Sequence, residues 1–359
     1  MINVTKTYLP PLEEYTKYLE RIWKNSWVTN NGPMLLELEE KLRRQLQVKN
    51  LFYTGNGTIA IQIVIKAMDL KGEIITTPFS YVATTSSILW ENCEPVFIDI
   101  DKSTFCINPD LIEQKITEHT KAILTTHVYG IPCDVEKIEQ IAKKHSLKVI
   151  YDAAHAFGTI YKTKSLVSYG SASTLSFHAT KLFHTIEGGA IITNDDQLAA
   201  KIKLCRSFGH MGDEHFSLGI NGKNSEFHAA MGLCLLDKVP FFIKKRKQLS
   251  EEYDKQLKNL NLIRPLIPTD TTYNYAYYPV LFKNEVDLLK VKKELEKNGI
   301  IPRRYFYPSL NKLPYIIDTQ NCPISEDYAT RVLCLPLYYE LSVSDVYTIC
   351  SIIISCYPT

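Results

Sequence analysis

The chain has 359 residues, of which 45% are hydrophobic and 22% are charged, a composition typical of a soluble globular protein. Its 41 basic and 39 acidic residues leave a formal net charge of +2, so the charge favours neither nucleic acid nor an anionic membrane as a partner. The N-terminus lacks a signal-peptide pattern and no apolar run approaches the ~20 residues of a membrane span, so we expect no membrane protein.

The first part of the chain predicts an arm over residues 1–25, in which Pro10 and Pro11 precede a short helix. Residues 35–46 carry apolar side chains at helical spacing and predict a second helix. Turn residues lie between these two segments, at 30–33.

From about residue 50, short apolar runs alternate with amphipathic segments. The apolar runs predict strands at 51–53, 73–77, 95–98, 122–126, 148–151 and 190–193. The amphipathic segments predict helices at 59–68, 82–91, 109–117, 135–145 and 197–208. This alternation indicates an α/β fold with a mostly parallel sheet that is covered by helices on both faces.

After Pro240 the pattern changes. Residues 241–260 predict a long helix, followed by a strand at 277–282 and helices at 286–297 and 344–354. We therefore expect an arm (1–25), a large domain (26–245) and a smaller C-terminal α/β domain (246–359).

The nine cysteines are scattered singly and form no Cys-x-x-Cys pair. An odd, unclustered set in a chain of this size indicates reduced thiols and a cytoplasmic protein. Buried packing explains such cysteines without a structural zinc site, and we expect no metal.

Open α/β sheets bind ligands at the carboxyl ends of their strands, so the residues after each strand are candidates for function. Residues 55–58 (Gly-Asn-Gly-Thr) begin a helix, whose N-terminal N–H groups suit a phosphate; a purely structural turn is the alternative. Tyr81 follows the strand at 73–77, where an aromatic ring stacks on a planar ligand or packs in the core.

Asp152 ends a buried strand, and His155 follows within one helical turn. A buried, ionised aspartate needs a positive partner, such as a protonated pyridine nitrogen; the alternative role is a helix N-cap. Lys181 lies 29 residues downstream (181 − 152), at a turn where a lysine forms a Schiff base if its amine is partly deprotonated. Ser176 offers a hydroxyl to phosphate. The common alternative for Lys181 is a surface lysine without a catalytic role.

In this order and spacing the motifs resemble those of the DegT/DnrJ/EryC1/StrS family of nucleotide-sugar aminotransferases. The resemblance extends over essentially the whole chain, from Leu9 to Tyr338. Its most specific pieces are Asn56-Gly57-Thr58, His127-x-Tyr129-Gly130, Asp152-Ala-Ala-His155, Ser176-Phe-His-Ala-Thr-Lys181 and Glu187-Gly-Gly189. It implies the aspartate-aminotransferase-like fold (fold type I) and pyridoxal 5′-phosphate as cofactor, with pyridoxamine 5′-phosphate as its intermediate form.

Carried over to this sequence, the resemblance implies that Lys181 is the Schiff-base lysine and proton shuttle. Asp152 would pair with the pyridine nitrogen, Tyr81 would stack on the ring, and His155 would contact the 3-hydroxyl, where many relatives have glutamine.

The resemblance also implies that Gly57, Thr58 and Ser176 hold the cofactor phosphate. Members of the family are homodimers with shared active sites, and Gly219-Ile220-Asn221 matches the loop that one subunit supplies to the other. Asn221 of the partner subunit is therefore expected at the phosphate.

The sequence departs from the family directly after this asparagine. The usual continuation is an aromatic residue and Arg-Met, whereas this chain has Gly222-Lys223-Asn224. Lys223 is a candidate replacement for the arginine as a phosphate or substrate contact, but lysine is not a bidentate equivalent. Arg304 and Tyr305 are further candidate substrate contacts, with core packing and surface exposure as the alternative.

Some relatives are sugar dehydratases with histidine at the lysine position; Lys181 therefore favours transamination. The resemblance is greatest to the branch that makes dTDP-4-amino-4,6-dideoxy-D-glucose from dTDP-4-keto-6-deoxy-D-glucose for O-antigen, with L-glutamate as amino donor. Amination at C3 of a dTDP-3-keto-6-deoxyhexose is the alternative reaction. A non-catalytic regulatory protein on the same fold is the alternative of a different class.

Overall fold

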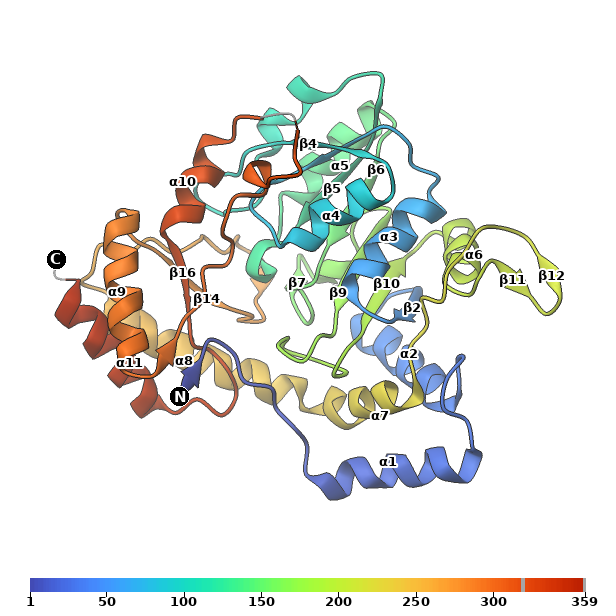
Figure 1. Ribbon diagram of the computed structural model, residues 1–359, viewed down its shortest axis with the longest axis horizontal. Helices are drawn as coiled ribbons and strands as arrows, with labels where there is room; N and C mark the ends of the chain where they lie inside the picture. The colour runs from blue at the N-terminus through green and yellow to red at the C-terminus, as the bar shows by residue number, and fades with distance from the viewer. Residues whose placement is uncertain (318–319, 358–359) are drawn as a thin grey trace.

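The computed structural model describes residues 1–317 and 320–357 and is built around a seven-stranded sheet (Figure 1). The strand order is β2-β10-β9-β6-β5-β3-β4. Every neighbouring pair is parallel except the two that involve β10, which runs against both β2 and β9. The strands are β2 (Asn50–Thr54), β3 (Glu73–Thr76), β4 (Glu94–Phe97), β5 (Thr120–Thr126), β6 (Lys148–Asp152), β9 (Ala172–Ser176) and β10 (Gly189–Thr193). The expected mostly parallel α/β fold is confirmed.

Helices cover both faces of this sheet because successive strand residues point to opposite sides. Ile191 of β10 packs into a core with helices α3 and α6, whereas its neighbour Ile192 packs into the core that contains α2, α5 and α7. The large-domain helices are α2 (Pro33–Leu46), α3 (Gly57–Ala67), α4 (Val82–Trp90), α5 (Val135–Lys144), α6 (Asp196–Cys205) and α7 (Glu226–Leu235). The N-terminal helix α1 (Leu12–Asn25) packs against α7.

One expected helix, at 109–117, is absent. The chain there forms two short 3₁₀ turns, Pro109–Leu111 and Glu113–Lys115. Only Ile112 of this stretch is fully buried, so a longer helix would have little apolar surface to bury.

The C-terminal part has its own hydrophobic core. This core lies between a two-stranded antiparallel sheet and three helices, and the expected boundary near residue 245 falls inside the first of them. The elements are α8 (Val239–Leu257), β14 (Tyr278–Leu281), α9 (Glu285–Lys297), β16 (Val332–Leu335) and α11 (Val343–Cys356). The chain's first strand, β1 (Ile2–Asn3), pairs with β15 (Ile300–Ile301), which places the N-terminus beside this unit (Figure 1).

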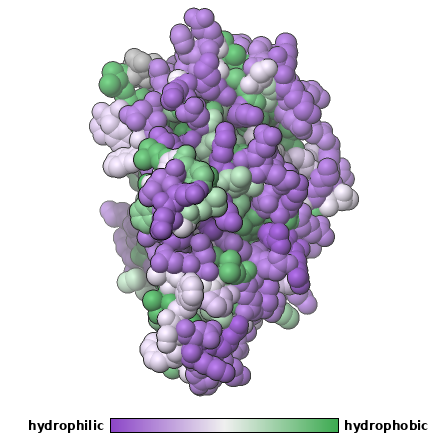
Figure 2. All heavy atoms as spheres, turned by 90° about the vertical axis from the view of Figure 1, so that its right-hand side faces the viewer, coloured by the Kyte–Doolittle hydropathy of each residue, from purple (hydrophilic) through white to green (hydrophobic). Residues whose placement is uncertain are grey.

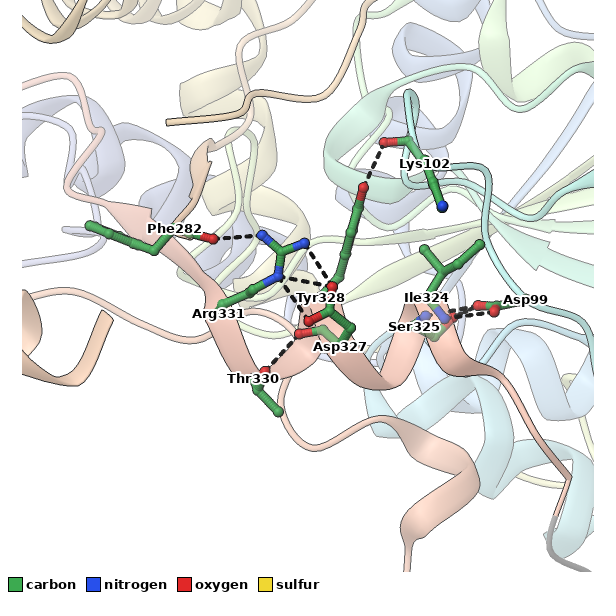
Figure 3. Close-up of polar contacts among 9 residues, drawn as sticks. All are labelled: Asp99, Lys102, Phe282, Ile324, Ser325, Asp327, Tyr328, Thr330 and Arg331. Carbon is green, nitrogen blue, oxygen red and sulfur yellow. Dashed lines mark hydrogen bonds and ion pairs between the residues drawn. The ribbon is translucent and has the colours of Figure 1, made fainter. Parts of the chain in front are cut away.

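Helix α10 (Pro323–Arg331) ties this C-terminal unit to the large domain (Figure 3). At its start, the buried Asp99 carboxylate accepts hydrogen bonds from the N–H groups of Ile324 and Ser325, each 2.8 Å long. At its end, Arg331 donates to the carbonyl of Phe282 in the small unit, at 2.6 Å. The helix thus bridges the two cores.

A short hairpin, β11 (His210–Met211) and β12 (Glu214–His215), projects from the large domain (Figure 1). The residues on and around it are apolar yet exposed: Phe208, Met211, Phe216, Leu218 and Ile220. Figure 2 views this side of the molecule, where apolar atoms interrupt a mostly hydrophilic surface. Within the described residues, no helix combines the length and apolarity that crossing a membrane requires.

Candidate active site

A cavity of about 480 Å³ opens at the carboxyl ends of the central strands. Asp152 ends β6, Ser176 ends β9 and Thr126 ends β5, and all three line the cavity. Parallel strands end at the same edge of a sheet, so the fold brings together residues that are far apart in sequence. Eight of the expected site residues line this cavity: Gly57, Thr58, Tyr81, Asp152, His155, Ser176, Lys181 and Tyr305.

One end of the cavity is formed by the N-terminus of α3. Asn56 caps this helix, since its side chain accepts a hydrogen bond from the Ile59 N–H at 2.8 Å. A Cβ on Gly57 would lie 3.0 Å from the Ser176 Cβ, so glycine permits the close approach of helix and strand. Thr58 and Ser176, which both carry hydroxyls, also line the cavity, and Ser176 lies next to Gly57 in space. This combination is suited to an anion.

Asp152 is buried deep in the cavity wall. Its Oδ2 accepts a hydrogen bond from the Thr84 hydroxyl at 2.6 Å, and its Oδ1 accepts one from the Ala154 N–H at 3.1 Å. Burial raises the pKa of this carboxyl, while the two hydrogen bonds and the charge of Lys181 act in the opposite direction. Each oxygen retains a lone pair, so the site can accept a cationic hydrogen-bond donor.

The His155 ring is held as a neutral donor. Its Nδ1 accepts the Tyr129 N–H at 3.2 Å, so the proton of the neutral ring is on Nε2. The ring lies nearly parallel to those of Tyr129 and Phe306. Burial, and then the charge of Lys181, holds the pKa of His155 well below its usual range.

Lys181 follows β9 and reaches into the cavity. Its Nζ lies 3.4 Å from the hydroxyl oxygen of Tyr277, a buried residue just before β14. Burial lowers the pKa of this amine, against the effect of Asp152, which raises it. A lysine with a depressed pKa is more often unprotonated and therefore nucleophilic.

Tyr81 lines the cavity, and 54% of this residue is exposed. Its backbone begins α4.

A family model described as the DegT/DnrJ/EryC1/StrS aminotransferase family matches residues 12–354. The chain belongs to this family.

Two relatives, each named dTDP-4-amino-4,6-dideoxy-D-glucose transaminase, are similar to this chain over almost its whole length. The one from Shigella dysenteriae is 42% identical over 352 residues, with 96% of each chain covered. The one from Escherichia coli is 41% identical over 362 residues, with 95% of each chain covered. The family expected from the motifs is thereby confirmed, and with it the aminotransferase class.

Solved structures of aminotransferases share the fold. DesI, crystallised in the presence of its TDP-sugar product, superposes with a TM-score of 0.94 at 30% identity, covering 99% of this chain and 93% of that one. PseC from Helicobacter pylori, an aminotransferase of pseudoaminic acid biosynthesis, superposes with a TM-score of 0.92 at 29% identity, covering 99% of both chains.

Arg304 was expected at the substrate, but the structure turns it away from the cavity of this aminotransferase. Its guanidinium donates to Glu285 at 2.7 Å and to the Thr330 carbonyl at 2.6 Å. The neighbouring Arg303 lines the cavity instead, 5.0 Å from the Tyr305 ring. Consecutive residues in extended backbone face opposite sides, and the sequence alone did not show which arginine faces inward.

Asn221 and Lys223 also lie outside the cavity of their own chain. Asn221 is exposed on the strand-like segment after the hairpin, paired with Ser207. The Lys223 amine lies 5.0 Å from the centre of the Phe208 ring, and burial together with the nearby Arg206 lowers its pKa.

Several cavity residues were not foreseen from the sequence. Tyr277 comes from the C-terminal unit and was interpreted only as part of a strand, whereas Arg303 and Phe306 lie in the 303–307 stretch that was a candidate nucleotide contact but were not chosen as site residues. Ser80 lies one residue before the predicted aromatic contact, but no local pattern distinguishes its hydroxyl from others.

Proposed function

We propose that this family member is a pyridoxal 5′-phosphate-dependent aminotransferase that converts dTDP-4-keto-6-deoxy-D-glucose to dTDP-4-amino-4,6-dideoxy-D-glucose. L-Glutamate is the proposed amino donor. One observation carries the proposal: a nucleophilic amine, a buried carboxylate and a capped helix N-terminus share one cavity. The 42% identity to the Shigella transaminase supports the choice of sugar.

The donor set of the cavity fits this cofactor. The Lys181 amine suits an aldehyde, and the free lone pairs of Asp152 suit a protonated pyridine nitrogen. The neutral His155 offers an Nε2–H to a ring oxygen. At the other end, the start of α3 and the Ser176 hydroxyl suit a phosphate, and the exposed Tyr81 ring suits stacking on a planar heterocycle.

When bound, the cofactor supplies the carbonyl group that accepts the amino group and the ring that delocalises a developing negative charge. The protein's own contribution is proton movement and positioning. Lys181 takes a proton from the α-carbon of the donor and returns it to the carbon that receives the amine. Burial lowers the pKa of Lys181, which increases the share of unprotonated amine, and the Tyr277 hydroxyl lies 3.4 Å from that amine.

Arg303 and Tyr305 are the proposed contacts for the nucleotide sugar. Both line the cavity from the C-terminal unit, and the guanidinium is exposed and within reach of an anionic ligand.

A homodimer with shared sites is part of the proposal. The exposed apolar residues around the β11–β12 hairpin favour burial against a second copy, because an exposed cluster of this kind commonly marks an interface. The exposed Asn221 follows this hairpin, and we propose that it reaches the cofactor phosphate of the partner subunit, with Lys223 nearby.

Nine free thiols suit the reducing cytosol, where we place the enzyme. Entry of the product into O-antigen remains part of the same proposal.

The direct test is NMR of the product after incubation with pyridoxal phosphate, glutamate and dTDP-4-keto-6-deoxy-D-glucose. We expect an amine at C4, and the coupling at H4 then gives its configuration. Lys181→Ala should reduce turnover by at least about 10³-fold while leaving the fold intact, because no other amine replaces it. An amine at C3, or full turnover in the variant, would overturn the proposal.

A further inference from the structure

Three buried hydroxyls form a continuous chain in the cavity wall and end on Asp152. The Thr126 Oγ1 lies 2.7 Å from the Ser80 Oγ, which lies 2.8 Å from the Thr84 Oγ1. The Thr84 Oγ1 lies 2.6 Å from the Asp152 Oδ2. All four residues are buried, and they come from β5, the loop after β3, α4 and β6.

The direction of this chain follows from the proton count. An ionised carboxylate can only accept hydrogen bonds, so the Thr84 hydroxyl must donate its single proton to Asp152. Ser80 must then donate to Thr84, and Thr126 must donate to Ser80. All three O–H dipoles therefore point toward the carboxylate, and hydrogen bonds aligned in this way strengthen one another.

We propose that Thr84, backed by Ser80 and Thr126, is a positioning residue that keeps Asp152 ionised and aimed at the cofactor's ring nitrogen. This inference rests on the proposed function, because it takes Asp152 to be the partner of that nitrogen. Thr84 does not line the cavity, so it acts only through Asp152.

The other groups around Asp152 do not replace this hydroxyl. The Ala154 N–H binds the other carboxylate oxygen, at 3.1 Å. The Lys181 amine and the neutral His155 also lie near Asp152, but proposed contacts with the cofactor occupy both. Burial alone raises the pKa of Asp152, so loss of the Thr84 donor leaves the carboxyl more basic. A more basic carboxyl takes the shared proton from the ring nitrogen.

The neighbouring residue supplies a matched control. Thr85 is as fully buried as Thr84 and lies on the same helix, but its Oγ1 has no hydrogen-bond partner among the described residues. Thr84→Val and Thr85→Val thus make the same chemical change, one with and one without the contact to Asp152.

The test uses the full-length protein with pyridoxal phosphate labelled with ¹⁵N at the ring nitrogen. In Thr84→Val we expect the ¹⁵N shift to move toward that of an unprotonated pyridine, and the cofactor dissociation constant from equilibrium dialysis to rise about tenfold or more. Thr85→Val should match the wild type in both. Thr84→Ser, which restores the hydroxyl, should return the shift to the wild-type value.

The outcomes separate the two ideas. If the wild-type protein takes up no cofactor, the proposed function fails. If it binds cofactor with a protonated ring nitrogen and the two valine variants behave alike, the role of Thr84 is overturned. If Thr84→Val does not fold, as judged by circular dichroism, Ser80→Ala serves as the second variant. An unchanged ¹⁵N shift in Ser80→Ala would also contradict the proposed role of the three hydroxyls.

Discussion

Two adjacent arginines show how one residue's position along extended backbone decides its role. Arg303 lines the cavity, while Arg304 is partly buried behind it. The Arg304 guanidinium lies 3.5 Å from the centre of the Tyr307 ring and binds Glu285 and the Thr330 carbonyl. The side chains have the same chemistry, but one faces a ligand site and the other holds the C-terminal unit together.

The pair predicts opposite outcomes for the same substitution. Arg303→Ala should raise KM for the nucleotide sugar about tenfold, because a charged contact to an anion is lost, with little change in thermal stability. Arg304→Ala should leave that KM within about twofold but cost roughly 1–3 kcal/mol of unfolding free energy, since Glu285 and two carbonyls lose their donor. Steady-state kinetics measure KM and urea unfolding measures stability for the two variants. A raised KM in Arg304→Ala alone would contradict the placement of Arg303, rather than Arg304, at the substrate.

At the scale of elements, α10 connects the large domain to the C-terminal unit, because it makes hydrogen bonds to both (Figure 3). Its N-terminus has free N–H groups, and the buried Asp99 from the large domain accepts two of them together with the Ser325 hydroxyl. Tyr328 adds a hydrogen bond to the Lys102 carbonyl at 3.2 Å. Arg304, between Arg303 and Tyr305, donates to the Thr330 carbonyl of α10 at 2.6 Å, which links this helix to the segment that lines the cavity.

The substitution Asp99→Asn tests how much the contact between Asp99 and the start of α10 stabilises the protein. The amide loses one of the two acceptor oxygens, so we expect about 1–3 kcal/mol of lost stability in urea unfolding. Asp327→Asn on the same helix is the control: its carboxylate is exposed and pairs with Arg331, and such surface pairs contribute at most about 1 kcal/mol. An equal loss of unfolding free energy in the two variants would show that the buried Asp99 contact stabilises the protein no more than the exposed ion pair does.

At the scale of the whole molecule, the proposed site draws residues from two copies of the chain. The cavity gathers eight of the expected residues, but Asn221 and Lys223 lie outside it, beside a protruding hairpin. Leu218 of that hairpin segment is 71% exposed, an unfavourable arrangement for a monomer in water.

Subunit mixing tests the shared site. Asn221→Asp places a negative charge against the proposed phosphate position and should inactivate the enzyme, as should Lys181→Ala. When the two variants are mixed and re-associated, half of the dimers are mixed and each has one intact site, so about a quarter of wild-type activity should return. No recovery, despite mixed dimers in native mass spectrometry, would place Asn221 in its own subunit's site.

The sequence by itself predicted six of the seven strands of the central sheet, its mostly parallel α/β architecture and the candidate residues at the strand ends, because strand alternation, glycine turns and helix caps are local signals. The strand β9 was not among those predicted. The sequence also placed Asp152 at the end of a strand and Lys181 at a turn 29 residues downstream, while the pairing of β6 with β9 comes from the structure. The helix predicted at 109–117 is wrong, because this segment has little apolar surface to bury and forms two short 3₁₀ turns instead.

Only the tertiary structure decided the rest. Tyr277 and Arg303 reach the cavity because a second unit docks on the sheet edge, and a long-range contact leaves no local pattern in the sequence. The hydroxyl chain behind Asp152 likewise joins residues 46 and 68 positions apart. Hydrogen-bond geometry of this kind depends on the packing of distant segments, which residue types and spacing do not encode.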